Sequence, residues 1–108
     1  MIEVIYHRTY HRLTIEGHAG SGEIGHDLVC ASVSTLAYTL AENISHMEAL
    51  GHLYSMNVCM DPGEAEIQCS PNTRYKSLVS LIFDSICAGF ALLARDYPEN
   101  ISYEIRGA

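Results

Sequence analysis

The sequence has few basic residues. Lys and Arg number six against thirteen Asp and Glu, which gives a formal net charge of -7. Binding to phosphates needs a surplus of Lys and Arg, so this composition argues against nucleic acid as a direct ligand. A strongly acidic chain is better suited to a basic protein partner.

Long apolar runs and paired cysteines are also missing. No stretch approaches the roughly 20 apolar residues that a membrane span needs, and the opening MIEVIYHRTYHR contains no apolar signal core. The four cysteines include no CxxC pair, so free thiols are the default expectation. We therefore expect a cytoplasmic protein that makes no membrane contact and needs no metal or other cofactor.

What the sequence does contain is enough apolar surface for one core. Its 108 residues are 48% hydrophobic and show no low-complexity segment. A chain of this length can form a hydrophobic core without metal or disulfide crosslinks. We expect a single domain over residues 1–108.

Alternating and helical patterns divide the chain into strands and helices. The predicted elements are strands over Ile2–Arg8 and Arg12–Gly17, a helix from Leu28 to about Met47, a hairpin over Tyr54–Ser70, a helix from Ser70 and Pro71 to near Tyr97, and a strand over Ile101–Ile105. Hairpins dominate these connections. The order ββαββαβ therefore favours an α+β fold, a two-layer sandwich of a mostly antiparallel sheet with two helices on one face.

The second hairpin has a register that the residues themselves indicate. Proline and glycine occupy the centre of the predicted turn Asp61–Glu64. If Asp61 pairs with Glu64, the apolar residues fall on one face, with Met60 opposite Ala65, Val58 opposite Ile67 and Met56 opposite Cys69. The same register puts Cys59 and Cys69 on opposite faces, which excludes a disulfide between them and leaves both as predicted packing residues.

The second predicted helix is the most apolar part of the chain. Its segment SLIFDSICAGFALLA is apolar on more than one face, which indicates that a partner subunit covers part of it. Cys87 lies in the middle of this helix and is predicted to be a core residue. We expect a homodimer.

Two histidines near the first turn admit two interpretations. His7 and His11 are four positions apart but flank a predicted turn and do not share a helix face. They are interpreted as surface strand residues, with metal binding as the alternative.

The stretch EGHAGSGEIGHDLVCASVS, Glu16 to Ser34, concentrates the residues that carry chemistry. Asp27 is a natural N-cap, so Cys30 is predicted in the first helical turn, where unpaired N–H groups and the helix dipole favour a thiolate and could hold an oxyanion. His18 ends a strand, and the glycines between allow its imidazole to reach the sulfur. Ser34 follows one turn after Cys30 on the same helix face. The alternative is that Cys30 is a buried core thiol.

The glycines admit a second interpretation. Gly20, Gly22 and Gly25 fit the GxGxxG of a dinucleotide site, which also needs an acidic residue about twenty positions later at the end of a parallel strand. Here that distance falls inside the predicted helix, near Glu42. A loop that opens and closes around a peptide is the simpler function, and a nucleotide site is the alternative.

The same residues carry a resemblance to a known family. The GHAG from Gly17, the glycine-rich stretch and HDLVCASVS from His26 resemble the ribosomal-processing cysteine proteases, the Prp family, as does the spacing of twelve between His18 and Cys30. Two departures are Ser32, where the family commonly has alanine, and His26, where it often has another residue.

The resemblance implies a function and a set of site residues. It implies a cysteine endopeptidase that removes the short N-terminal extension of a large-subunit ribosomal protein. Cys30 would be the nucleophile and His18 the general base and acid, Asp27 would orient an imidazole or cap the helix, and the substrate-binding residues would be Gly20, Gly22, Gly25 and Ser34. The alternatives are a ribosome-assembly module that binds the same partner without cleaving it and a nucleotide-binding domain.

Overall fold

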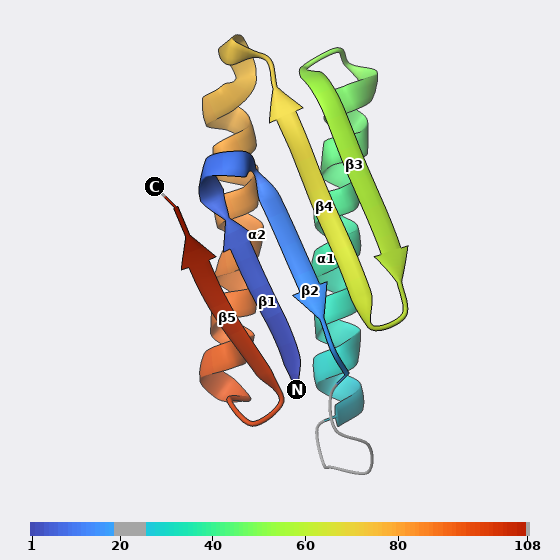
Figure 1. Cartoon of the computed structure of the whole chain (residues 1–108), viewed down its shortest axis with the longest axis vertical. Helices are drawn as coiled ribbons and strands as arrows, with labels where there is room; N and C mark the ends of the chain where they lie inside the picture. The colour runs from blue at the N-terminus through green and yellow to red at the C-terminus, as the bar shows by residue number, and fades with distance from the viewer. Residues whose placement is uncertain (19–25, 108) are drawn as a thin grey trace.

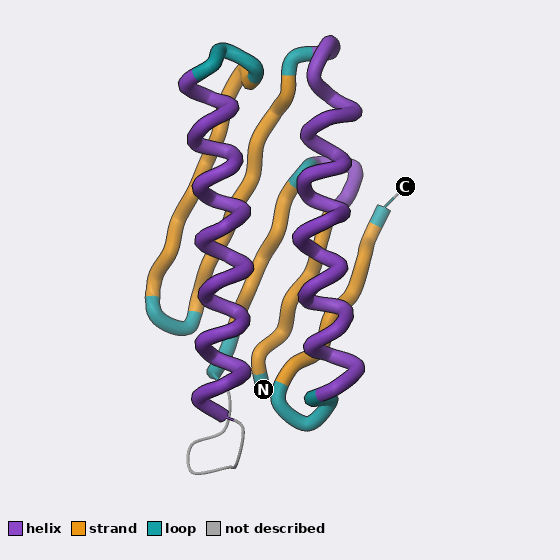
Figure 2. The backbone as a smooth tube through the Cα atoms, turned by 180° about the vertical axis from the view of Figure 1, so that it is seen from behind, coloured by secondary structure: helices purple, strands orange, loops and turns teal. Residues whose placement is uncertain are grey.

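The computed structural model describes residues 1–18 and 26–107. The five strands are β1 (Ile2–His7), β2 (Arg12–Glu16), β3 (Leu53–Asp61), β4 (Glu64–Pro71) and β5 (Ile101–Arg106), with short 3-10 helices η1 (Arg8–Tyr10) and η2 (Thr73–Tyr75). Helices α1 (His26–Ala49) and α2 (Lys76–Asp96) lie side by side on one face of the sheet (Figures 1 and 2). The predicted order and two-layer α+β architecture are confirmed.

The strands form one sheet in the order β3-β4-β2-β1-β5. Three neighbouring pairs are antiparallel and the β1–β5 pair is parallel, so the sheet is mostly antiparallel, as predicted. Helix α1 carries the chain from β2 to the far edge, and the β3–β4 hairpin then returns to pair with β2 (Figure 1). This pairing brings the β3–β4 turn beside the end of β2, where His18 follows.

The core lies between the sheet and the two helices. Alternate residues of β1 and β2 and one stripe of each helix are buried, as their patterns predicted. The buried residues include Ile2, Val4, Tyr6, Leu13 and Ile15 from the strands, Val29, Val33, Ala37, Leu40 and Ile44 from α1, and Val79, Phe83, Cys87 and Phe90 from α2.

The register predicted for the second hairpin is confirmed at every pair. Asp61 lies opposite Glu64, and the apolar pairs follow as expected. Cys69 is buried, whereas Cys59 is exposed on the other face and its thiol donates to Asp61 Oδ2 at 3.3 Å. The packing role predicted for Cys59 is therefore wrong, because its face of the sheet is the one without helices.

Both helices begin at different residues from those predicted. Helix α1 starts at His26, so Asp27 is its second residue and not its N-cap, and Cys30 is its fifth. Ser70 and Pro71 belong to β4, where Pro71 pairs with Leu53, and α2 starts at Lys76 after the N-cap Tyr75. A proline is tolerated there because it lies beyond the residues of β4 that pair with β2 and beside an irregularity in the β3–β4 register.

His11 is buried, which corrects its interpretation as a surface residue. Its backbone has a φ of 49°, a left-handed conformation at the end of η1. The ring lies inside the protein, where Nε2 is 2.9 Å from Ser80 Oγ and the ring packs edge-on against Phe83. In the described part of the chain, no group of three or more His, Cys, Asp or Glu residues is arranged to hold a metal ion.

Helix α2 is more apolar than expected. Within the helical segment Thr73–Asp96, an 18-residue window reaches a mean hydropathy of 2.0, so the helix is long and apolar enough to cross a membrane by length and composition. The expectation that no stretch reaches this limit was wrong. In this fold one stripe of the helix, with Val79, Phe83 and Phe90, packs into the core, as core helices of globular domains do.

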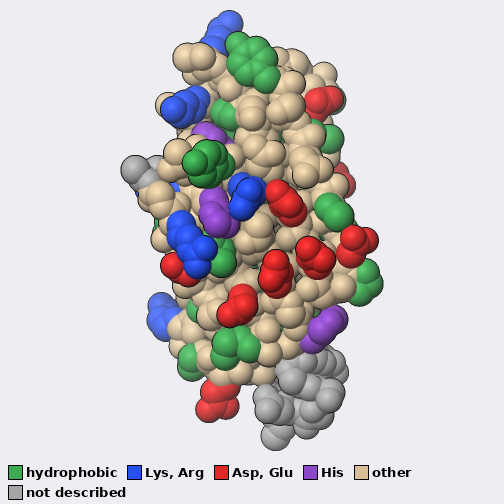
Figure 3. Space-filling view, viewed as in Figure 1, with side chains coloured by type: hydrophobic (Ala, Val, Ile, Leu, Met, Phe, Trp, Pro, Cys, Tyr) green, Lys and Arg blue, Asp and Glu red, His purple; other side chains and the backbone are tan. Residues whose placement is uncertain are grey.

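The face of the sheet away from the helices carries a row of acidic residues. Glu3 lies opposite Glu16, Glu16 opposite Glu64, and Glu64 opposite Asp61, so four carboxylates cross four adjacent strands in register. All four residues are exposed. Figure 3 shows acidic side chains gathered across the lower part of this face.

Candidate active site

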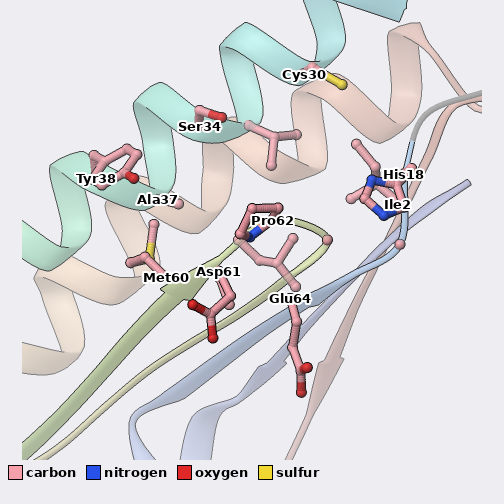
Figure 4. A pocket seen from close by; sticks show the side chains of 15 residues that line it. Ile2, His18, Cys30, Ser34, Ala37, Tyr38, Met60, Asp61, Pro62 and Glu64 are labelled. Atoms are coloured by element: carbon pink, nitrogen blue, oxygen red, sulfur yellow. The ribbon is translucent and has the colours of Figure 1, made fainter. Parts of the chain in front are cut away.

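A cavity of about 290 Å³ lies between α1 and one end of the sheet. Helix α1 contributes one wall, the end of β2 a second, and the β3–β4 turn a third (Figure 4). The lining residues are Ile2, Ile15, Gly17, His18, Cys30, Val33, Ser34, Ala37, Tyr38, Met60, Asp61, Pro62, Gly63, Glu64 and Ala65. The pocket combines apolar walls with a thiol, an imidazole and a hydroxyl.

The structure brings Cys30 and His18 into this one pocket from different layers. Cys30 projects from α1 and is half-buried, whereas His18 follows β2 and is exposed. Figure 4 places both side chains at the same end of the pocket. Within the described residues no hydrogen bond joins the Cys30 thiol to the His18 imidazole. Catalytic hydrogen bonds often tighten only when substrate is bound.

The start of α1 changes the expected relation between Cys30 and the free N–H groups. The first four N–H groups of a helix lack intrahelical partners. Because α1 begins at His26, Cys30 lies one residue beyond this first turn. The helix begins two residues before the predicted start at Leu28. Cys30 and the free N–H groups therefore do not share the first turn, and the free N–H groups precede Cys30 in the chain.

The backbone around His18 is held on both sides. The backbone nitrogen of Met1 donates to the His18 carbonyl oxygen at 2.8 Å. The Gly17 N–H donates to the Gly63 carbonyl oxygen at 2.9 Å. Gly17 has a φ of +101°, which favours glycine, and a Cβ there would collide with the Met1 carbonyl oxygen. His18 is thus tied to both β1 and the β3–β4 turn.

The other predicted site residues fall partly inside the described chain. Ser34 lines the pocket one turn after Cys30, as its spacing predicted, and its hydroxyl has no hydrogen bond to any described residue. Gly20, Gly22, Gly25 and the side chain of Asp27 lie outside the described part of the chain.

The β3–β4 turn contributes residues to the pocket that no pattern in the sequence placed there. Pro62, Gly63 and Met60 line the pocket, although they are more than forty residues from His18 in the sequence. Asp61 and Glu64 border it, but their carboxylates point away from α1 (Figure 4). Only the β2–β4 register, which joins distant segments, brings this turn to the site. In the sequence, the signal for these pocket residues is the predicted turn Asp61–Glu64.

The remaining three thiols are poor candidates for a nucleophile. Burial raises the pKa of Cys69 to about 11 and that of Cys87 to about 12. A hydrogen bond to the Asp61 carboxylate, together with its charge, raises the pKa of Cys59. Because the thiolate is the reactive form, these surroundings leave Cys30 as the candidate within the pocket.

Comparison with known families decides the class of protein. Residues 1–102 match the family described as Cysteine protease Prp. The chain belongs to the Prp family. It is therefore a cysteine protease, and the family resemblance of Gly17 to Ser34 is confirmed. A search of curated proteins finds no match.

Solved structures of similar fold cover nearly the whole chain. SMU.848 from Streptococcus mutans is 30% identical, with 96% of this chain and 90% of that chain covered and a TM-score of 0.64. The essential ribosomal processing protease Prp from S. aureus, in complex with a covalently linked product peptide, is 20% identical, with 97% of each chain covered and a TM-score of 0.69. The same protease with a substrate peptide gives 19% identity, 97% coverage of each chain and a TM-score of 0.69.

The strand order also argues against the nucleotide-binding alternative. A dinucleotide site needs a parallel strand directly beside the strand that precedes the glycine loop. Here the strand after α1 is β3, and β4 separates it from β2. The glycine loop is therefore not part of such a βαβ unit.

Proposed function

We propose that this protease removes the short N-terminal extension of a large-subunit ribosomal protein, with Cys30 as nucleophile and His18 as general base and acid. The observation that carries the proposal is that Cys30 and His18, on different layers of the fold, line the same end of one pocket. The formal net charge of -7 supports a basic protein substrate.

The proposed reaction proceeds through a thioester. His18 accepts the proton of the Cys30 thiol, and the sulfur attacks the carbonyl carbon of the scissile peptide bond. The carbon–nitrogen bond then breaks as His18 returns the proton to the leaving amine. Water, deprotonated by His18, hydrolyses the thioester and restores the Cys30 thiol. Free N–H groups at the start of α1 are the proposed oxyanion donors, and Ser34 and the glycine-rich loop the proposed peptide contacts.

The decisive experiment is mass spectrometry of a synthetic peptide that spans the N-terminal extension of the same organism's ribosomal protein. Wild-type protein should cut it once, and Cys30→Ala and His18→Ala should leave it intact. Cys59→Ala is the matched control, since it removes an exposed thiol outside the pocket and should cut normally. An intact peptide with folded, reduced wild-type protein would favour the assembly module that binds without cleaving.

The role of Asp27 is testable separately. As an orienting residue it would hold an imidazole in the productive tautomer, and as a first-turn acid it would only stabilise the start of α1. Asp27→Asn should lower turnover far more than stability in the first case. Equal losses would assign it to the helix alone.

We also propose that the protein forms a homodimer through the exposed face of α2. Leu78, Leu81 and Leu92 are 45%, 62% and 47% exposed on this helix. Light scattering at micromolar concentration should give twice the mass of the chain, and Leu81→Lys should reduce it to the monomer. Leu50→Lys is the control, because Leu50 is 56% exposed but lies in the turn after α1. A monomeric wild type would contradict the dimer.

We place the reaction in the cytoplasm, where ribosomal proteins are made.

A further inference from the structure

We propose that Gly63, in the β3–β4 turn, is a positioning residue for the imidazole of His18, a role that rests on the proposed function. Gly63 and His18 are 45 residues apart in the sequence. They meet because β4 pairs with β2, so the turn before β4 lies beside the residue after β2. Gly63 leaves the space that the ring occupies and takes no part in the chemistry.

The ring lies directly against the space where a side chain at position 63 would stand. A Cβ on Gly63 would lie 2.5 Å from Nε2 and 2.6 Å from Cε1 of His18. Real Cβ atoms do not approach other atoms so closely, so the imidazole occupies this position only because residue 63 is glycine. The contact involves the edge of the ring that carries a titratable nitrogen.

A backbone hydrogen bond fixes the same two segments together. The Gly17 N–H donates to the Gly63 carbonyl oxygen at 2.9 Å. The residue before His18 is therefore bonded to the residue that His18 touches. The imidazole of His18, by contrast, is the end of an exposed side chain. A side chain at position 63 would consequently be relieved by moving the imidazole and not the strand.

Two separable features require glycine at position 63. Its φ is +77°, a conformation that L residues rarely adopt, and its missing side chain makes room for His18. Gly51, in the turn after α1, has the same φ of +77°, but among the described residues, apart from Gly51 and its two chain neighbours, no atom lies within 4 Å of the place that its Cβ would take. Gly51→Ala therefore reports the backbone strain alone, and Gly63→Ala reports that strain together with displacement of the imidazole.

The experiment compares these two variants in stability, activity and ring position. Both should lower Tm by a similar amount. Gly63→Ala should lower kcat for the extension peptide by roughly 10- to 100-fold with a smaller change in KM, whereas Gly51→Ala should keep wild-type kcat. The His18 Cε1–H resonance, assigned with His18→Gln in protein carrying labelled histidine, should move in Gly63→Ala and stay in place in Gly51→Ala.

The ring resonance keeps the inference separate from the proposed function. If wild-type protein does not cleave the peptide, the proposed function fails, but displacement of the His18 signal still decides the contact. Equal kcat and an unmoved His18 signal in Gly63→Ala would overturn the inference. If Gly63→Ala does not fold, Gly63→Asn and Gly51→Asn replace the pair, because Asn tolerates a positive φ while still carrying a Cβ.

Discussion

Glu16 of β2 lies directly opposite Glu64 of β4 on the exposed face of the sheet. Glu3 continues the row on one side and Asp61 on the other. Like charges directly opposite each other destabilise a sheet. The row therefore lowers the stability of the fold at the end that also holds the pocket.

Neutralising the centre of this row should stabilise the protein. Glu16→Gln removes repulsion from two neighbours and should raise the free energy of unfolding by roughly 0.2–1 kcal/mol at low salt. Urea unfolding at low and high salt measures the gain, which should shrink as salt screens the row. Glu104→Gln is the control, because Glu104 accepts hydrogen bonds from Arg106 and should not stabilise on neutralisation. A gain from Glu16→Gln that is independent of salt would contradict this explanation.

Thiol labelling should distinguish Cys30 from the other cysteines. Burial raises the pKa of Cys69 and Cys87, and the Asp61 carboxylate raises that of Cys59. Brief treatment with iodoacetamide at neutral pH should therefore modify Cys30 first, as peptide mapping would show. Asp61→Asn should accelerate labelling of Cys59 alone. Labelling of Cys59 at the rate of Cys30 in the wild type would count against this order.

Stability should fall in mild acid because of His11. Burial lowers the pKa of this imidazole, and Lys76 lowers it further while Asp84 opposes them. The unfolded chain, with an ordinary pKa of 6.5, then binds a proton more readily than the folded one. The stability that the neutral His11 ring contributes is fully present above the unfolded pKa of 6.5 and is lost as the pH falls through the lower pKa of the folded state.

A comparison of wild type with a His11 variant tests whether this histidine causes the loss of stability in acid. His11→Asn is the suitable variant because asparagine tolerates the left-handed backbone at this position. Urea midpoints measured between neutral and mildly acidic pH should decline more steeply for wild type than for His11→Asn. Parallel curves would assign the acid sensitivity to other groups.

A methyl group at position 17 should be poorly tolerated. In Gly17→Ala the new Cβ meets a backbone carbonyl oxygen of Met1, which cannot rotate away, and the positive φ adds strain. Gly51→Ala carries the strain without the collision and should cost about 1–2 kcal/mol. Thermal unfolding should show a clearly larger loss of Tm for Gly17→Ala, and equal losses would show that β1 moves to accommodate it.

Local pattern predicted what depends on neighbours in the sequence. The Asp61–Glu64 turn and the alternation around it were sufficient for the complete register of the second hairpin. The pairing of β2 with β4 and of β1 with β5 was not predictable in the same way. These contacts depend on where two helices carry the chain, which no local alternation encodes.

The errors at individual residues have similar causes. Asp27 has the side chain of an N-cap, but an acidic residue is also favourable inside the first turn, so α1 could begin earlier. Pro71 suits both the start of a helix and the end of a strand. Residue type alone predicts a packing role for Cys59, whereas the hairpin register places it opposite Glu66, away from the core.

The position of Cys30 on the helical layer and His18 on the sheet makes catalysis depend on how the two layers are held together. A small opening between α1 and the sheet would separate nucleophile from base without melting either element. Proteins open locally at a lower free energy than they unfold. Enzyme activity should therefore be lost at a lower urea concentration than the helical circular dichroism signal. Turnover would then report on the packing between α1 and the sheet.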